Sequence, residues 1–305
     1  MKMKSLPLAM ALAGLGLFSL LCASQNKEKG NVAPEKLERV AAALPQKAAE
    51  PKKKRKLLIY TETKGYRHQS IDIGKVAFEA MGKESGAYES VVSNDLGNFE
   101  AEAIQEFDAI CFLNTTLEVF RPHPVKFKLL NKEEKDKALE KERRLQQNLL
   151  NYVKNGGGFI GIHAASDTFY QWAEFGEMLG GYFDGHPWNA RTDVSIVLAK
   201  GAEGNPIVTS MKDGEALNFK EEIYQLKDPY DSSKLDMLLR LDTENSDMKV
   251  RGIKRTDNDF GVSWTKSYGK GRVFYCSLGH NEHIYWNPKV LSIYLNGIQW
   301  AMGDL

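Results

Sequence analysis

Four of the six histidines lie beside glycines or at the ends of apolar segments, positions that suit a reactive side chain. His68 follows the first strongly apolar segment after residue 55, and His163 ends a glycine-containing apolar segment. His186 and His280 each follow a glycine directly. Imidazole exchanges protons near neutral pH and binds metals in its neutral form. One histidine alone is usually a hydrogen-bonded structural residue, but four in such positions indicate a shared site.

Two kinds of chemistry suit these histidines and the acidic residues near them. In a metal site, His163, His186 and His280 would hold a divalent ion such as zinc, and Glu222 is a further candidate ligand. In a metal-free site, His163 or His280 would be the base, and Glu222 or Glu282 the acid. The sequence has no compact ligand motif such as H-x-x-x-H, so both alternatives stay open.

The segments around these residues alternate between strand-like and helix-like patterns. Helices are predicted over 70–84, 130–154 and 288–302, and the charged stretch 132–144 should face solvent. Strands are predicted over 57–61, 88–92, 107–114, 159–163, 193–199, 235–241, 262–266 and 272–277. This order predicts an α/β fold with an open, mainly parallel sheet and helices on both faces. The site of such a sheet lies beyond the carboxyl ends of the strands, where histidines far apart in sequence meet.

The N-terminal region differs in composition from the rest of the chain. Lys2 and Lys4 precede a short apolar run, so residues 1–24 are predicted to be a signal peptide. Cys22 is a candidate lipidation site, and ordinary cleavage near residue 23 is the alternative. We therefore expect an exported protein, either periplasmic or anchored to the membrane only through this lipid.

The region between the signal peptide and the first strand is polar. Residues 25–55 carry few large apolar side chains and are predicted to be a flexible linker that folding does not need. Only a short helix near residues 35–44 is compatible with its pattern. The folded domain is expected to span residues 56–305.

Charge and cysteine content narrow the possible functions. The chain has 41 Lys and Arg residues against 40 Asp and Glu residues, a balance that does not favour binding to nucleic acid. Cys111 and Cys276 each lie inside an apolar strand, so we expect two buried free thiols, with a disulfide between them as the alternative in an oxidising compartment.

Several stretches, taken in order, resemble the ThuA-like (trehalose-utilisation) family over about residues 56–303. They are Gly65-Tyr66-Arg67-His68, residues 158–163 with Asp167, Tyr182-Phe183 with His186-Pro187, Glu222-Ile223-Tyr224, and residues 275–280. The resemblance implies a flavodoxin-like fold similar to that of class I glutamine amidotransferases. It also implies a link to the uptake or breakdown of trehalose and other glycosides, in which keto-sugars are intermediates.

The comparison with amidotransferases excludes one activity. Those enzymes place a cysteine nucleophile on the tight turn after the strand that corresponds to residues 159–162, and here that position is His163. Cysteine-dependent amidotransfer is therefore not expected. The remaining expectation is a hydrolase, lyase or isomerase that acts on a glycoside or keto-sugar. The alternative is a non-catalytic sugar-binding lipoprotein that delivers its ligand to a partner protein.

Aromatic and polar residues near these stretches are candidates for contacts with a sugar. Aromatic faces pack on the apolar face of a sugar ring, although at least half of such residues would be ordinary core residues. The candidates are His68, Asp167, Tyr170, Trp172, Trp188 and Tyr224. Asp167, four residues after His163, is also a candidate helix cap or a partner that orients an imidazole.

Overall fold

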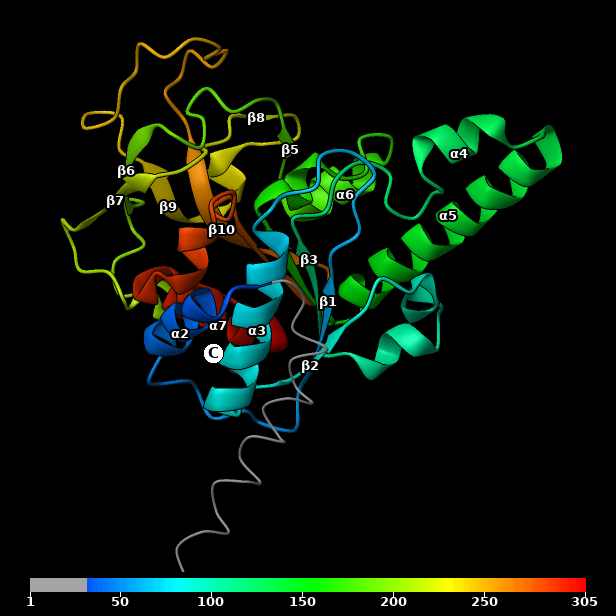
Figure 1. Cartoon of the computed structure of the whole chain (residues 1–305), viewed down its shortest axis with the longest axis horizontal. Helices are drawn as coiled ribbons and strands as arrows, with labels where there is room; N and C mark the ends of the chain where they lie inside the picture. Colours follow the sequence, from blue (N-terminus) through cyan, green and yellow to red (C-terminus); the bar gives the residue numbers. More distant parts are fainter. Residues whose placement is uncertain (1–31) are drawn as a thin grey trace, which may run out of the picture.

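The computed structural model describes residues 32–305, so the predicted signal peptide with Cys22 lies outside the described residues. The strands are β1 (Lys56–Tyr60), β2 (Glu89–Val92), β3 (Ala109–Leu113), β4 (Gly158–Ile162), β5 (Tyr182–Phe183), β6 (Asp193–Leu198), β7 (Ala216–Lys220), β8 (Leu226–Lys227), β9 (Asp236–Leu241), β10 (Gly261–Tyr268) and β11 (Gly271–Cys276). The α-helices are α2 (Pro34–Ala43), α3 (Ile71–Ser85), α4 (Pro124–Leu129), α5 (Lys132–Lys154), α6 (Ala173–Leu179) and α7 (Pro288–Met302). The main sheet has the order β2-β1-β3-β4-β11-β10-β9-β6-β7 (Figure 1).

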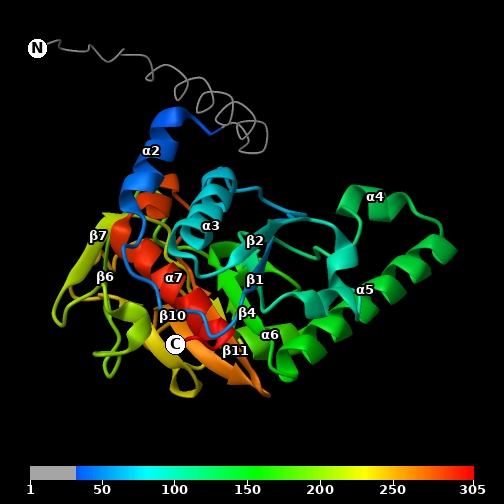
Figure 2. The same cartoon turned by 90° about the horizontal axis from the view of Figure 1, so that it is seen from below.

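The pairings from β2 through β11 are all parallel, which confirms the predicted α/β fold. Side chains of β1 alternate between two hydrophobic cores. Leu57 and Ile59 pack on the side of α3 and α7, whereas Leu58 and Tyr60 pack on the side of α5 and α6. A parallel strand covered on both faces must be apolar throughout, and this is why these segments are continuous apolar runs. Helices lie on both sides of the sheet in Figure 2.

Beyond β11 the sheet continues with antiparallel strands. A two-residue connection joins β10 to β11, and so short a link can join only antiparallel strands. β9, β6 and β7 each pair antiparallel with the strand before them in the sheet. Four reversals separate β11 from β7, so these two strands point the same way. β7 was not predicted, because its burial pattern is short and irregular.

The N-terminal helix corrects the predicted flexible linker over residues 25–55. From residue 32 this region is part of the domain: Val40 is 1% exposed and lies in the core beside α3 and α7. Figure 1 shows α2 lying beside α3. The amide of Ala49 donates to Gln299, and the amide of Lys52 donates to Asp304. A few apolar positions on one face of a short helix are enough to bury that face, even when the helix is polar in its overall composition.

The charged helix forms as predicted, except that Glu142, within the stretch expected to face solvent, is buried and pairs with Arg121. Asn131 begins α5 with a capping box, in which its side chain and that of Glu134 exchange hydrogen bonds with the backbone. The first half of α5 projects from the molecule together with α4 (Figure 2). Among residues 32–305, no helix combines the length and apolarity needed to cross a bilayer.

Candidate metal centre

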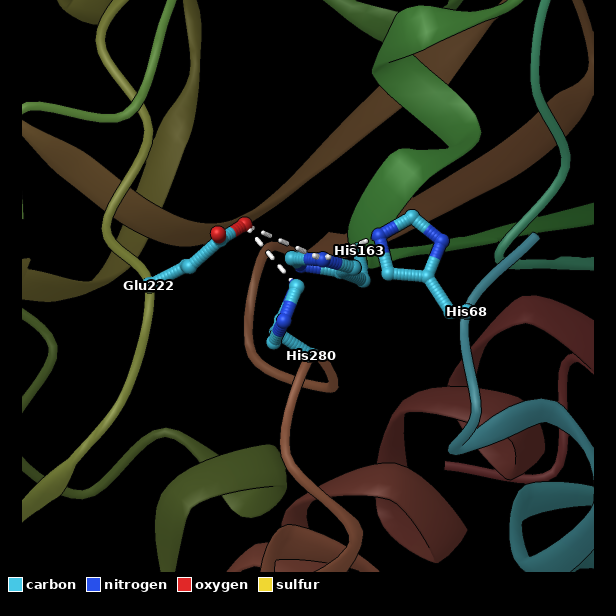
Figure 3. Close-up of side chains that lie close together, drawn as sticks. All are labelled: His68, His163, Glu222 and His280. Carbon is cyan, nitrogen blue, oxygen red and sulfur yellow. Dashed lines mark hydrogen bonds and ion pairs between the residues drawn. The ribbon is translucent and has the colours of Figure 1, made fainter. Parts of the chain in front are cut away.

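Three histidines and one glutamate meet at the carboxyl edge of the sheet (Figure 3). They are His68, His163, His280 and Glu222, and one ligand atom from each lies within 4.8 Å of all the others. We call these four residues the His3Glu group. Its members are buried, apart from His280, which is partly exposed.

The sheet brings the four residues to one edge. His163 directly follows β4, and His280 follows β11, which is the parallel neighbour of β4. His68 lies in the loop between β1 and α3. Glu222 follows β7, which points in the same direction as β11 after four antiparallel steps. Because all four strands end at the same edge, residues far apart in sequence converge there.

The turn at His163 aims its ring into the group. His163 has a φ of 49°, a left-handed conformation that is uncommon for a residue with a β-carbon. Its Nδ1 lies 2.6 Å from the carbonyl oxygen of Ser277, so Nδ1 carries the hydrogen and donates it. Nε2 is therefore the atom that carries the lone pair. Burial is the main cause that holds the pKa of His163 well below its usual value, so the ring is neutral.

Three groups surround the Nε2 atom of His163. The Nε2 atom of His68 is 3.2 Å away, and the Oε2 atom of Glu222 is 3.8 Å away. The hydroxyl of Tyr224 is 2.7 Å away and donates to this nitrogen. Glu222 and Tyr224 are two residues apart in an extended segment, so both side chains lie on the same side of it.

The pKa values of His68 and His280 are shifted in opposite directions, because the charges around the two rings differ. Burial, followed by the nearby charges of His280 and His186, lowers the pKa of His68 to about 3. Burial also acts to lower the pKa of His280, but the carboxylate of Glu222 outweighs it and the pKa is raised. The Nδ1 atom of His280 lies 2.9 Å from the Oε2 atom of Glu222, without the angle of a hydrogen bond.

These separations fit a metal ion at the centre. Zinc binds histidine nitrogens at about 2.0–2.1 Å, so two tetrahedral ligands lie about 3.3 Å apart. The three contacts within the group given above, at 3.2, 3.8 and 2.9 Å, lie around that value. The Nδ1 atom of His280, which faces Glu222, is buried without a hydrogen-bond partner among the described residues. Two neutral imidazoles, a third imidazole and a carboxylate are the donor set that zinc and similar ions prefer.

The structure rearranges the predicted metal ligands. His163, His280 and Glu222 come together, and His68, expected only to touch substrate, joins them. His186, expected as a ligand, stays at the rim: its Nδ1 atom is 3.6 Å from the Oε1 atom of Glu222, and its side chain is 47% exposed. His186 follows β5, which pairs with β8 outside the main sheet, so it does not lie at the end of a strand of the main sheet.

Two predicted acidic residues lie outside the group. Glu282 pairs with Lys36 of α2 at 2.6 Å. It lines a pocket of 280 Å³ beside His280, together with Tyr66 and Trp286. Asp167 accepts a hydrogen bond from the hydroxyl of Tyr170. It does not orient His163, because the Ser277 carbonyl has that role.

Of the predicted aromatic contacts, two belong to the core. Trp188 is fully buried, donates to the carbonyl of Asp247 and packs on Phe260. Trp172 is buried among phenylalanines on the other face of the sheet. Neither presents a ring face to a ligand. Tyr224 lies at the group, and Tyr170 lies half-buried beneath Lys227. An unpredicted residue, Tyr66, is 61% exposed and stacks on His280.

Sequence reasoning missed the residues that support the group from behind. Asn114, which follows β3, donates from Nδ2 to Ser70 and to the carbonyl of Gly279. Glu221 accepts hydrogen bonds from the backbone that carries His280. The only available signal was the acidic pair 221–222 next to apolar residues, where two buried carboxylates are unusual.

Cys111 and Cys276 are both buried free thiols, as predicted. Burial raises the pKa of Cys276 to about 12 and that of Cys111 well above its usual value. Such thiols are not activated nucleophiles. Together, fold and site define an α/β protein that has a histidine–carboxylate centre at the carboxyl edge of its sheet.

Comparisons with known proteins agree with this description. The family model described as ThuA, trehalose utilisation, matches residues 56–301. The chain therefore belongs to the ThuA family, and the resemblance found in the sequence is confirmed. No match to a curated protein was found.

Solved structures show the same fold. A ThuA-like protein from Bacteroides uniformis is 22% identical with a TM-score of 0.60, and the match covers 83% of this chain and 94% of that one. A ThuA-like protein from Parabacteroides merdae is 18% identical with a TM-score of 0.57, over 82% and 90% of the two chains. A cytoplasmic protein from Salmonella typhimurium is 15% identical with a TM-score of 0.52, over 81% and 98%. At these identities the likeness establishes the fold.

Proposed function

We propose that this protein is an exported, metal-dependent enzyme that acts on a glycoside or keto-sugar. The observation that carries the proposal is the His3Glu group, whose four ligand atoms lie within 4.8 Å of one another. Membership of a family described by trehalose utilisation supports a sugar as substrate. Export is proposed from the predicted signal peptide, with periplasmic release or a lipid anchor at Cys22 as its two forms.

The proposed chemistry assigns separate roles to the group and its surroundings. A divalent ion held by the group would polarise a sugar carbonyl or activate a bound water. His186 stays outside the group with an accessible ring next to Glu222, so it is free to transfer a proton to or from substrate. The pocket of 280 Å³ beside His280 offers Tyr66 and Trp286 as faces for a sugar ring.

A non-catalytic sugar carrier is less well supported. A carrier would need a cleft lined by aromatic and amide groups without convergent acid–base residues. Here the acid–base residues converge, and Trp172 and Trp188 lie in the core. The proposal therefore favours an enzyme.

Metal content tests the first half of the proposal. The purified protein should bind one zinc or cobalt ion per chain, and His163→Ala should lose this binding because it removes the central ligand nitrogen. Titration calorimetry and elemental analysis measure the stoichiometry. His123→Ala is the matched control, since His123 caps α4 and is no member of the group. Equal metal content in all three proteins would refute a metal centre.

Turnover tests the second half. Trehalose and its keto-sugar oxidation product should be converted by the metal-loaded protein and left unchanged by His163→Ala. Product analysis by chromatography detects hydrolysis, elimination or isomerisation. Binding of either sugar without conversion, at full metal occupancy, would favour the carrier alternative.

A further inference from the structure

Glu221 connects the loop that carries His280 to the segment that carries Glu222. It is completely buried, and its side chain accepts hydrogen bonds from three consecutive backbone amides. Its Oε1 atom is 3.0 Å from the nitrogen of Gly279 and 2.6 Å from that of His280. Its Oε2 atom is 3.0 Å from the nitrogen of Asn281. We propose that Glu221 is the positioning residue of the centre, which fixes His280 and Glu222 relative to one another.

The chemistry of the contact explains why a carboxylate is needed. Three successive amides of a loop have no strand partner, and leaving buried N–H groups unpaired is costly. A carboxylate has two oxygens that only accept hydrogen bonds, so it satisfies all three amides at once. A buried carboxylate is in turn costly unless it is hydrogen-bonded. The three amides therefore need the carboxylate and the carboxylate needs the amides, and this mutual dependence holds the loop in one conformation.

The opposite side of the loop is also fixed. The carbonyl of Gly279 accepts hydrogen bonds from the hydroxyl of Ser70, at 2.7 Å, and from Asn114, at 3.1 Å. Gly279 has a φ of 135°, and a β-carbon there would lie 2.7 Å from the hydroxyl of Tyr285. The loop is thus held at its carbonyl from one side and at its amides by Glu221 from the other, so the position of His280 depends on both.

The inference rests on the proposed metal centre and is tested by Glu221→Gln. Glutamine has nearly the same shape, but it keeps one accepting oxygen and turns an NH₂ group towards an amide. We expect affinity for Co²⁺ to fall at least tenfold, as found for residues that orient metal ligands. The d–d absorption of bound Co²⁺ should also change, because it reports ligand geometry and a loss of stability alone does not move it.

A matched control separates positioning from stability. Glu142 of α5 is also buried, at 2% exposure, and pairs with Arg121 outside the centre. Glu142→Gln should lower the free energy of unfolding and leave both Co²⁺ affinity and spectrum unchanged. If Glu221→Gln does not fold, Glu221→Asp replaces it: the charge is kept but the shorter side chain reaches fewer amides, and affinity should still fall.

The outcomes are distinct. No Co²⁺ binding by the unaltered protein would refute the proposed metal centre, and the inference with it. Normal binding by the unaltered protein together with unchanged affinity and spectrum in a folded Glu221 variant would overturn the inference alone. A tenfold loss in the Glu221 variant and none in Glu142→Gln would support it.

Discussion

At the scale of single residues, the centre depends on backbone positions that few residues adopt. His163 follows β4 in a left-handed conformation, which costs an ordinary residue about 1–2 kcal/mol. The hydrogen bond from its Nδ1 to the carbonyl oxygen of Ser277 and the burial of its side chain hold the ring in place and offset this strain. Strain of this kind is common at functional sites because it aims a side chain where a regular strand would not.

Asp167 provides a residue-scale prediction about pH. Burial raises its pKa from 3.8 to about 6, although the hydroxyl of Tyr170 donates to it and acts in the opposite direction. The folded state thus prefers the protonated acid. This contribution to stability is complete below pH 3.8 and is lost as pH rises through 6.

Asp167→Asn should remove this dependence, because asparagine still accepts the hydrogen bond but does not ionise. We expect the free energy of unfolding of the variant, relative to the unaltered protein, to rise by about 2 kcal/mol between pH 4 and pH 7. Urea denaturation at four pH values across this interval measures it. A difference that stays constant with pH would contradict the assignment.

At the scale of elements, the N-terminal helix supports the centre from outside. Lys36 of α2 pairs with Glu282, and Arg39 lies over the ring of Trp286 at 5.5 Å. Both partners belong to the short helix Glu282–Trp286, which begins two residues after His280. α2 therefore packs against the segment that leads away from the centre.

Deleting residues up to 52 should consequently destabilise the domain. Burial of Val40 alone contributes about 1.5–3 kcal/mol, and the hydrogen bonds of Ala49 and Lys52 are lost as well. We expect the free energy of unfolding of a chain that begins at residue 53 to be at least 2 kcal/mol lower than that of a chain that begins at residue 32. Urea denaturation of the two chains provides the comparison, and equal midpoints would restore the interpretation as a linker.

At the scale of the whole molecule, metal binding should stabilise the entire fold. The His3Glu group draws on loops after β1, β4, β7 and β11, so only the native sheet assembles it. A ligand that binds only the native state at 100 times its Kd adds about 2.7 kcal/mol. For a chain of this size that corresponds to a rise in Tm of about 5–10 °C.

Calorimetry with excess Zn²⁺ and with a chelator measures this difference in Tm. His163→Ala should show no rise with Zn²⁺, because it lacks the central nitrogen. The same rise in this variant would mean that the ion binds elsewhere.

Much of the fold follows from the sequence alone. Apolar runs identified β3 and β4, and the helix predicted over 288–302 matches α7. His163 and His280 were found because they follow such strands. These features are local: the spacing of apolar residues determines which face of a segment is buried, and glycine and proline mark its ends.

Only the tertiary structure decided which of the candidate residues surround the centre and which others join them. Glu222 arrives at the right edge only because four antiparallel steps return β7 to the direction of β11. The role of Glu221 follows from its hydrogen bonds to three amides distant in sequence, and Trp188 proved to be a core residue. The physical reason is that periodicity specifies a buried face but not the element that covers it. Strand order and hydrogen-bond partners are contacts between distant segments, and the folded chain as a whole determines them.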